Sequence, residues 1–204
     1  MRELLPIETV PNDAVERLLD RAFGSDRHGR TAYRLRDGTG AIAGLSFALI
    51  RPVVGPVTGS VLGERIGTGT LLGTIQCWPV QHVGDDGVVT PLVLVGPVAV
   101  APEHQRDGHG RQLMQAALAA ADARSLDLML IGDPEYYGRF FGFDAAATAA
   151  WRLPGPVERH RLLARGAGVP HGGGTIGARV GALARPLPAA DASLVEAHAD
   201  GAPS

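Results

Sequence analysis

The stretch VAVAPEHQRDGHGR, from Val98 to Arg111, decides what kind of fold this chain has. Its first half is apolar and predicts a strand, and its second half opens a helix through a tight loop with Gly108 and Gly110 at alternate positions. Glycine lets a backbone approach a ligand closely, and the N–H groups of a helix N-terminus carry partial positive charge. The stretch therefore predicts a phosphate-binding turn that needs no lysine, and the alternative is a plain strand-to-helix turn eased by glycine.

The composition of the whole chain favours a globular domain. The chain has 204 residues, of which 28 are glycine, 15 are proline and 45% are hydrophobic, enough apolar surface for a core. We expect one domain over residues 1–186, with a long β-hairpin connection at about residues 52–69. The small, acidic residues 187–204 are typical of a flexible tail.

Charge and cysteine content exclude several classes of function. All 19 basic residues are arginine, which excludes a lysine Schiff base and the lysine of a Walker phosphate loop. A net charge of −2 without a basic stripe argues against nucleic acid as a partner. Cys77 is the single cysteine and His82 and His104 lack metal-ligand spacing, so no metal is expected. No signal peptide or membrane span is evident, and the expected location is the cytoplasm.

The order of elements predicts an α+β fold with a mixed sheet. Helical spacing or strand patterning is found throughout the first three quarters of the chain. Asp133-Pro134 is a helix-start signal, because aspartate is a good N-cap and proline suits the first helical position. The expected helices cover residues 14–23, 31–36, 108–124 and a short stretch after 134, and the expected strands cover residues 4–10, 41–51, 70–80, 88–100, 126–131 and 141–153, with one more over 157–164.

Two motifs carry a family resemblance. Gln105 to Gly110 fits the pattern Q/R-x-x-G-x-G/A, whereas a dinucleotide-binding fingerprint fails because Leu113 stands where its third glycine belongs. The later stretch GDPEYYGRFFGF, residues 132–143, places tyrosines on a short helix before Gly-Phe. In this order the motifs resemble the GNAT superfamily of N-acetyltransferases, in its YhbS-like branch. The resemblance implies a GNAT-like, mostly antiparallel sheet of about six or seven strands, flanked by about four helices and splayed between the fourth and fifth strands.

The resemblance also implies a site for acetyl-CoA as co-substrate. The backbone N–H groups of the loop would hold the pyrophosphate, and the pantetheine arm would pair with the strand at Val98 and Val100. The Gly96-Pro97 pair is consistent with the splay, because it predicts a bulge. The residues implied in binding are Val98, Ala99, Val100, Gln105, Arg106, Asp107, Gly108, His109, Gly110 and Arg111.

The family's chemistry is direct attack of an amine on the thioester, with a tyrosine as general acid for the leaving thiolate. Tyr137 is the candidate and Tyr136 the alternative. Four residues follow Tyr137 before Gly-Phe, where the family has three, so either hydroxyl remains an option. No carboxylate stands between Thr90 and Pro102, where some members carry a base, and neither Glu103 nor Asp133 is assigned that role.

The function implied is an acetyl-CoA-dependent N-acetyltransferase that transfers acetyl to a primary amine of a small molecule or peptide. A non-catalytic acyl-CoA-binding module and a transferase that uses a longer acyl-CoA are the alternatives. The sequence leaves open the acceptor, the acyl chain, the base and the oligomeric state, with a homodimer as one option.

Overall fold

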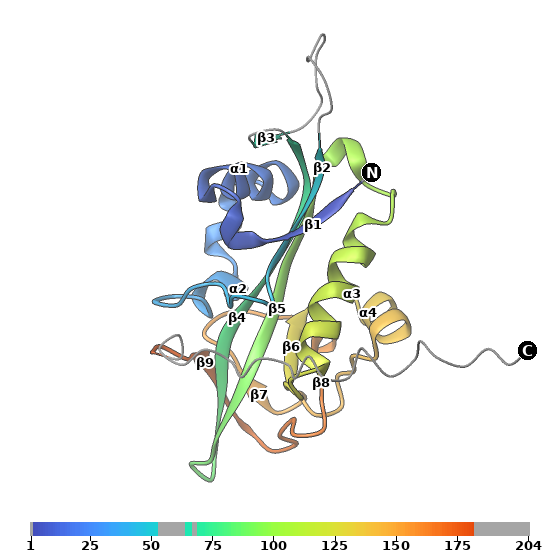
Figure 1. Ribbon diagram of the computed structural model, residues 1–204. Helices are drawn as coiled ribbons and strands as arrows, with labels where there is room; N and C mark the ends of the chain where they lie inside the picture. Colours follow the sequence, from blue (N-terminus) through green and yellow to red (C-terminus); the bar gives the residue numbers. More distant parts are fainter. Residues whose placement is uncertain (1, 53–63, 67–68, 182–204) are drawn as a thin grey trace, which may run out of the picture.

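The computed structural model describes residues 2–52, 64–66 and 69–181. Its strands form one sheet with the central order β1-β2-β4-β5-β6-β8, to which β3 and β9 add on β4 and β7 adds on β9 (Figure 1). The sheet is mixed and mostly antiparallel, with parallel pairing of β5 with β6 and of β7 with β9. This confirms the predicted GNAT-like α+β class, although the described residues form nine strands rather than six or seven.

Four α-helices flank the sheet in the described part of the chain, as expected. Among these residues, no helix has the length and apolar character required to cross a membrane. The helices are α1 (Asn12–Phe23), α2 (Thr31–Arg34), α3 (His109–Asp122) and α4 (Pro134–Phe141). The strands are β1 (Glu3–Pro6), β2 (Phe47–Pro52), β3 (Glu64–Ile66), β4 (Gly69–Gly84), β5 (Val89–Val100), β6 (Leu128–Ile131), β7 (Trp151–Arg152), β8 (Leu162–Arg165) and β9 (Gly174–Ala178).

The two faces of the sheet are covered by different helices, with α1 and α2 on one side and α3 and α4 on the other (Figure 1). Side chains along β5 alternate between the faces, as the pleat requires. Val93 and Val95 pack in the cluster beneath α3, whereas Leu92 and Leu94 pack on the opposite face with Trp151. Both faces of the central strands are therefore buried, which explains why these strands lack alternating polarity.

Helix α3 approaches the sheet closely because its inner stripe is built of small and aliphatic residues. Leu113, Ala117 and Ala121 on this stripe are buried against the strands. Gly73 on β4 lies beneath the helix, where a Cβ would stand 3.0 Å from Leu113 and closer still to the Ala99 carbonyl oxygen. This tight packing fixes the N-terminus of α3 relative to the end of β5.

Strands β5 and β6 separate beyond a short pairing. Val93 pairs with Leu128 and Leu94 with Met129, after which β5 continues to Val100 without a strand partner on that side in the described residues. At the separation, Gly96-Pro97 forms a bulge, because the register with β4 shifts between Ile75 and Cys77. The predicted bulge and the predicted splay are both present, and together they leave an opening in the sheet between β5 and β6.

Several predicted element boundaries are wrong. The strand predicted over residues 4–10 ends at Pro6 and continues as a 3-10 turn, and the strand predicted over 41–51 begins only at Phe47, after Gly44 turns the chain at positive φ. The region predicted as strand over 141–153 contains only the two residues of β7, and residues 157–161 precede β8 without being a strand. In the region 141–153 a local hydrogen bond favours a turn over a strand, because the Asp144 carboxylate accepts from the Ala146 N–H at 2.8 Å.

Strand β9 was not predicted, because its sequence GTIGA begins within a glycine run and lacks the apolar pattern of a strand. It pairs with the second half of β4 from Val80 to Gly84. Gly174 makes this pairing possible, because a Cβ there would collide with the buried imidazole of His82. Most of the expected hairpin connection, residues 53–63 and 67–68, and the tail from 187 lie outside the described residues.

Candidate active site

The loop after β5 presents uncapped helix amides. Pro102–His104 form a 3-10 turn, and α3 then begins at His109 with Gly108 as its N-cap. Gly108 has φ +78° and Arg106 has φ +76°, so two residues of the loop adopt the left-handed backbone conformation before the helix begins. No side chain caps the helix at Gly108, which leaves the first N–H groups available to an outside acceptor. This is the backbone geometry that favours an anion.

A cavity of about 470 Å³ lies against this loop, and we call it the loop cavity. Arg106, Arg111, His104 and His109 line it, and no carboxylate does. Gly110 faces β5, because a Cβ there would stand 3.9 Å from Val98 and 3.7 Å from Val100, in ordinary van der Waals contact. The full lining is Val100, His104, Gln105, Arg106, Gly108, His109, Gly110, Arg111, Tyr136 and Phe140.

Asp107 lies behind the loop cavity between two histidines. Its carboxylate is 3.6 Å from Nδ1 of His104 and 3.8 Å from Nε2 of His109, and the guanidinium of Arg2 is 2.9 Å from Nδ1 of His109. The potential ligand atoms of His104, Asp107 and His109 all lie within 4.8 Å of one another, a grouping that sequence spacing did not indicate. Because Arg2 donates to Nδ1, the Nε2 of neutral His109 carries the proton and faces Asp107 as a donor.

The free energy of unfolding is expected to fall as the pH is lowered through about 6.5. Burial, the largest cause, lowers the pKa of both His82 and His109. The unfolded chain therefore binds these protons at a higher pH than the folded chain does, and stability is lost between the ordinary and the lowered pKa values. Denaturant unfolding followed from about pH 8 to about pH 5 measures this slope. A double variant His82→Asn, His109→Asn should show a flatter profile, and an unchanged slope would contradict the assignment.

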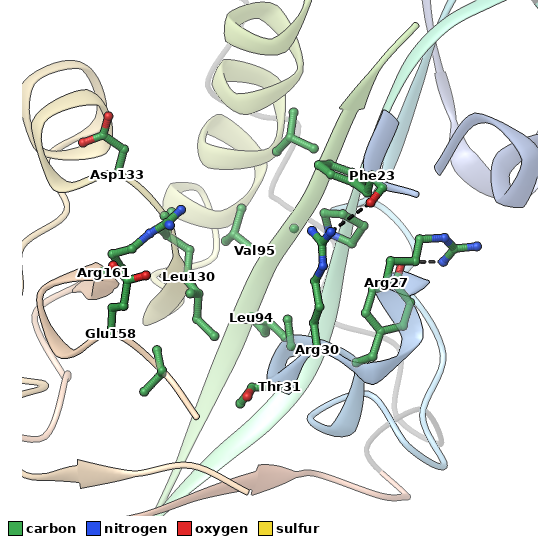
Figure 2. Close-up of a pocket in the computed structure, with 18 of the residues that line it drawn as sticks. Phe23, Arg27, Arg30, Thr31, Leu94, Val95, Leu130, Asp133, Glu158 and Arg161 are labelled. Atoms are coloured by element: carbon green, nitrogen blue, oxygen red, sulfur yellow. Dashed lines mark hydrogen bonds between the residues drawn. The ribbon is translucent and has the colours of Figure 1, made fainter. Parts of the chain in front are cut away.

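A second cavity, of about 550 Å³, lies where β5 and β6 separate, and we call it the sheet cavity (Figure 2). On one side it is lined by residues 94–98 of β5 and by residues from the end of β6 to α4. Residues 156–161 lie on the same side as β6 and α4, and the segment from Phe23 to Arg36 lies on the other side (Figure 2). Four segments distant in sequence therefore meet at the point where the sheet opens.

Tyr137 faces the sheet cavity from α4. Its ring packs against Phe143 and lies in the space left by Gly132, where a Cβ would stand 2.6 Å from the ring carbon Cδ2. Burial raises the pKa of its hydroxyl, with Tyr136 acting in the same direction and Arg161 opposing. The phenol is therefore protonated at neutral pH and can donate a proton into the cavity.

Tyr136, the neighbouring residue, lines the loop cavity instead. The two rings meet edge to face, with centroids 5.1 Å apart. Consecutive residues on one helix turn thus face two cavities, which both border the C-terminal half of β5. An extended ligand that fills both cavities would pass between β5 and the start of α4.

Similarities between this chain and known proteins agree with this architecture. Residues 54–143 match the model of the acetyltransferase (GNAT) family. This match to the GNAT family includes both motifs, residues 105–110 and 132–143. No curated protein matches the sequence significantly.

Two solved structures resemble this chain over most of its length. The GNAT family N-acetyltransferase YhbS from Escherichia coli, solved in complex with CoA, aligns with a TM-score of 0.57 at 22% identity, over 88% of this chain and 89% of that one. A GNAT family acetyltransferase from Brucella melitensis, solved in complex with acetyl-CoA, aligns with a TM-score of 0.55 at 21% identity, over 88% and 96%. The family match and the shared fold confirm that the two motifs indicated the correct family.

The other residues considered for chemistry in the GNAT domain have structural partners. Asp133 caps α4, as predicted, by accepting from the Glu135 N–H at 2.9 Å. Glu103 pairs with Arg21 at 2.6 Å. Cys77 is buried, and this burial raises the pKa of its thiol to about 12, so it is no nucleophile.

Sequence reasoning did not single out most of the charged lining of the sheet cavity. Glu158 and the arginines at 27, 30 and 36 lie there beside Asp133 and Arg161. Of these, only Asp133 had a role predicted from the sequence, as the start of a helix. No local motif marks the others, because they meet only when the segment before β2 folds over the opening of the sheet.

Gly132→Ala is expected to lower kcat by about 10- to 100-fold with little change in acetyl-CoA binding. The added methyl group would displace the ring of Tyr137, while the loop cavity does not include Gly132. Steady-state kinetics combined with calorimetric CoA binding measure the two effects separately. Gly177→Ala is the matched control, since its Cβ would meet nothing within 4 Å. In a Tyr137→Phe background the Gly132 substitution should cost little further kcat, and a full additional loss would refute displacement of Tyr137 as the cause.

Proposed function

We propose that this protein is an N-acetyltransferase that transfers acetyl from acetyl-CoA directly to the primary amine of a small molecule or peptide. The observation that carries the proposal is the pair of cavities along one strand edge, with uncapped helix amides in one and a buried, protonated tyrosine in the other. The solved relatives that hold CoA and acetyl-CoA share this fold, which supports the choice of co-substrate.

The loop from Gln105 to Gly110 would hold the pyrophosphate. The first N–H groups of α3 have no side-chain cap, and Arg106 and Arg111 add positive charge in a cavity where no described carboxylate lies in the lining. Asp107 lies outside the cavity lining, with its carboxylate near the two histidines. Such a site binds a diphosphate through amides and arginines alone.

The free edge of β5 would bind the pantetheine arm. Residues 95–100 pair with β4 on one side and leave backbone groups at Val98 and Val100 without a strand partner on the other in the described residues. An amide chain can add there as a strand does, and a backbone N–H of β5 would polarise the thioester carbonyl. Ala99 points to the opposite face, where it is buried with α1, and so supports the strand rather than touching the ligand.

Tyr137 would act as general acid. The acceptor nitrogen bonds to the carbonyl carbon, the carbon–sulfur bond breaks, and the phenol hydroxyl gives its proton to the departing sulfur. Solvent then returns a proton to the phenolate and takes the surplus proton from the new amide nitrogen. Tyr136 lines the other cavity, which supports Tyr137 as the donor.

The test has a binding arm and a turnover arm. A ligand at about 100 times its Kd stabilises a protein by about 2.7 kcal/mol, so CoA and acetyl-CoA should raise Tm clearly. A panel of primary amines is then offered with acetyl-CoA, and free thiol and acetylated product are measured together. Absence of any Tm shift would sink the proposal, and binding without turnover on any amine would identify a non-catalytic module. Competition with longer acyl-CoAs reports the acyl preference.

A further inference from the structure

The sheet cavity carries an excess of positive charge. Four arginines line it, at positions 27, 30, 36 and 161, against two carboxylates, Asp133 and Glu158. Both carboxylates come from the side of the cavity that also holds Arg161, whereas the segment from Phe23 to Arg36 contributes only arginines to the charged lining (Figure 2). The cavity therefore has one purely basic wall and one wall of mixed charge.

Two arginines of the basic wall are already satisfied. Arg27 pairs with Glu16 at 2.5 Å and with Asp20 at 2.8 Å, and its guanidinium points away from the cavity in Figure 2. Arg30 donates to the backbone carbonyl of Phe23 at 2.8 Å. The charge of Arg27 is neutralised by these two carboxylates of the protein, and Arg30 is exposed to solvent.

Arg36 is different, because it is buried without an acidic partner. Its residue exposure is 9%, and its guanidinium carbon lies 3.5 Å from the centre of the Tyr33 ring and 4.5 Å from that of Trp78. Within the described residues, no carboxylate lies within ion-pair distance of it. Stacking on aromatic rings offsets part of the cost of burying the cation, and burial lowers its pKa.

An arginine stacked in this way is ready for an anion. The guanidinium lies over both rings, and the N–H groups of an arginine fork match the two oxygens of a carboxylate. The phosphates of CoA do not supply this anion if the proposed function holds, because the loop cavity holds them. The anion would then belong to the acceptor.

We infer that the acceptor is a small amine that also carries a carboxylate, as an amino acid does, with the carboxylate on Arg36 and the amine toward Tyr137. This inference rests on the proposed function and names its acceptor class. Asp133 and Glu158 lie on the mixed wall beside Tyr137, where they favour the entry of a positively charged amine. The two ends of a zwitterion thus match the two walls.

The direct test is product binding to the CoA-saturated protein. N-acetylglycine, N-acetyl-leucine and N-acetylphenylalanine are titrated by calorimetry beside their neutral amides, which differ only in the anionic group. We expect the acids to bind at least about tenfold more tightly than the amides. Equal affinities for acid and amide, or no binding of any acid by a protein that binds CoA, would overturn the inference while leaving the proposed function standing.

Variants locate the anion. Arg36→Met keeps the aliphatic stem and should abolish the preference for acids, whereas Arg36→Lys keeps the charge without the fork and should retain part of it. Arg34→Met is the matched control, because Arg34 is exposed, bonds to the Pro154 carbonyl and does not line the cavity. A preference that survives in Arg36→Met would assign the anion elsewhere and refute the role of Arg36.

Turnover gives an independent readout. With paired amines such as leucine and leucinamide, Arg36→Met should raise KM for the acid and leave KM for the amide unchanged. CoA binding, measured separately, distinguishes the two proposals. A protein that fails to bind CoA disproves the transferase, whereas a protein that binds CoA without preferring acids disproves the anion site.

Discussion

Tyr137→Phe is expected to lower kcat by about 10²- to 10⁴-fold, the range contributed by a positioned general acid. The substitution removes one oxygen atom and leaves the ring in the space above Gly132, so the fold should be unaffected. Acetyl-CoA binding should change by less than twofold, because the departing sulfur needs the proton only as the carbon–sulfur bond breaks. Steady-state kinetics on any amine that the wild type accepts, with calorimetric binding of acetyl-CoA, measure both quantities.

Tyr136→Phe is the comparison, since the two tyrosines are neighbours on α4. Tyr136 lines the loop cavity, so its loss should affect CoA binding more than kcat. A larger fall in kcat for Tyr136→Phe than for Tyr137→Phe would reverse the assignment. Equal and small effects for both would mean that water supplies the proton.

The second large effect is expected at Gly108, where an aspartate should weaken acetyl-CoA binding by about 10- to 100-fold relative to an asparagine. Gly108 has φ +78°, a conformation that asparagine and aspartate tolerate better than other residues with a Cβ. A Cβ there meets no atom within 4 Å and lies at the loop cavity, so either side chain fits. The two variants share shape and differ in charge. Two unit charges 4 Å apart interact by about 4 kcal/mol at an effective dielectric constant of 20, which makes the chosen range conservative.

Calorimetry of acetyl-CoA with Gly108→Asp and Gly108→Asn at low and high ionic strength tests this prediction. Salt should narrow the difference, because the cavity is open to solvent and screening acts on exposed charges. Denaturant unfolding of both variants checks that they are equally stable. Equal affinities at low salt would show that the start of α3 does not hold the phosphates.

The site divides into a part that local sequence predicts and a part that it does not. The start of α3 and the cap of α4 are local, because each depends on residues within one turn: Gly108 takes a positive φ, and Asp133 accepts from the amide two residues on. The extra residue between Tyr137 and Gly-Phe left the choice of tyrosine open. In the folded structure Tyr137 enters the space over Gly132 and lines the sheet cavity, whereas Tyr136 lines the loop cavity.

The basic wall illustrates why the rest of the site could not be predicted from the sequence. Arg36 belongs to a segment with no recognisable motif, and its aromatic neighbours are Tyr33, three residues away, and Trp78 on β4. Arg36 and Tyr137 line the same cavity only because the segment before β2 and the start of α4 meet where the sheet opens. Strand β9 was missed for a related reason, because a glycine-rich segment becomes a strand only through the edge of β4 that it meets.

By itself, the sequence determined the glycine turn that opens α3, the bulge at Gly96-Pro97 and the resemblance to a family, because each depends on the conformational limits of glycine and proline in a short stretch or on the pattern of a motif. Only the tertiary structure decided which tyrosine faces the opening of the sheet and which charges surround it. Those depend on contacts between segments about a hundred residues apart, such as Thr31 with the Pro156 carbonyl, 125 residues further along the chain. Local preferences carry no information about such contacts, since burial of the whole core selects them.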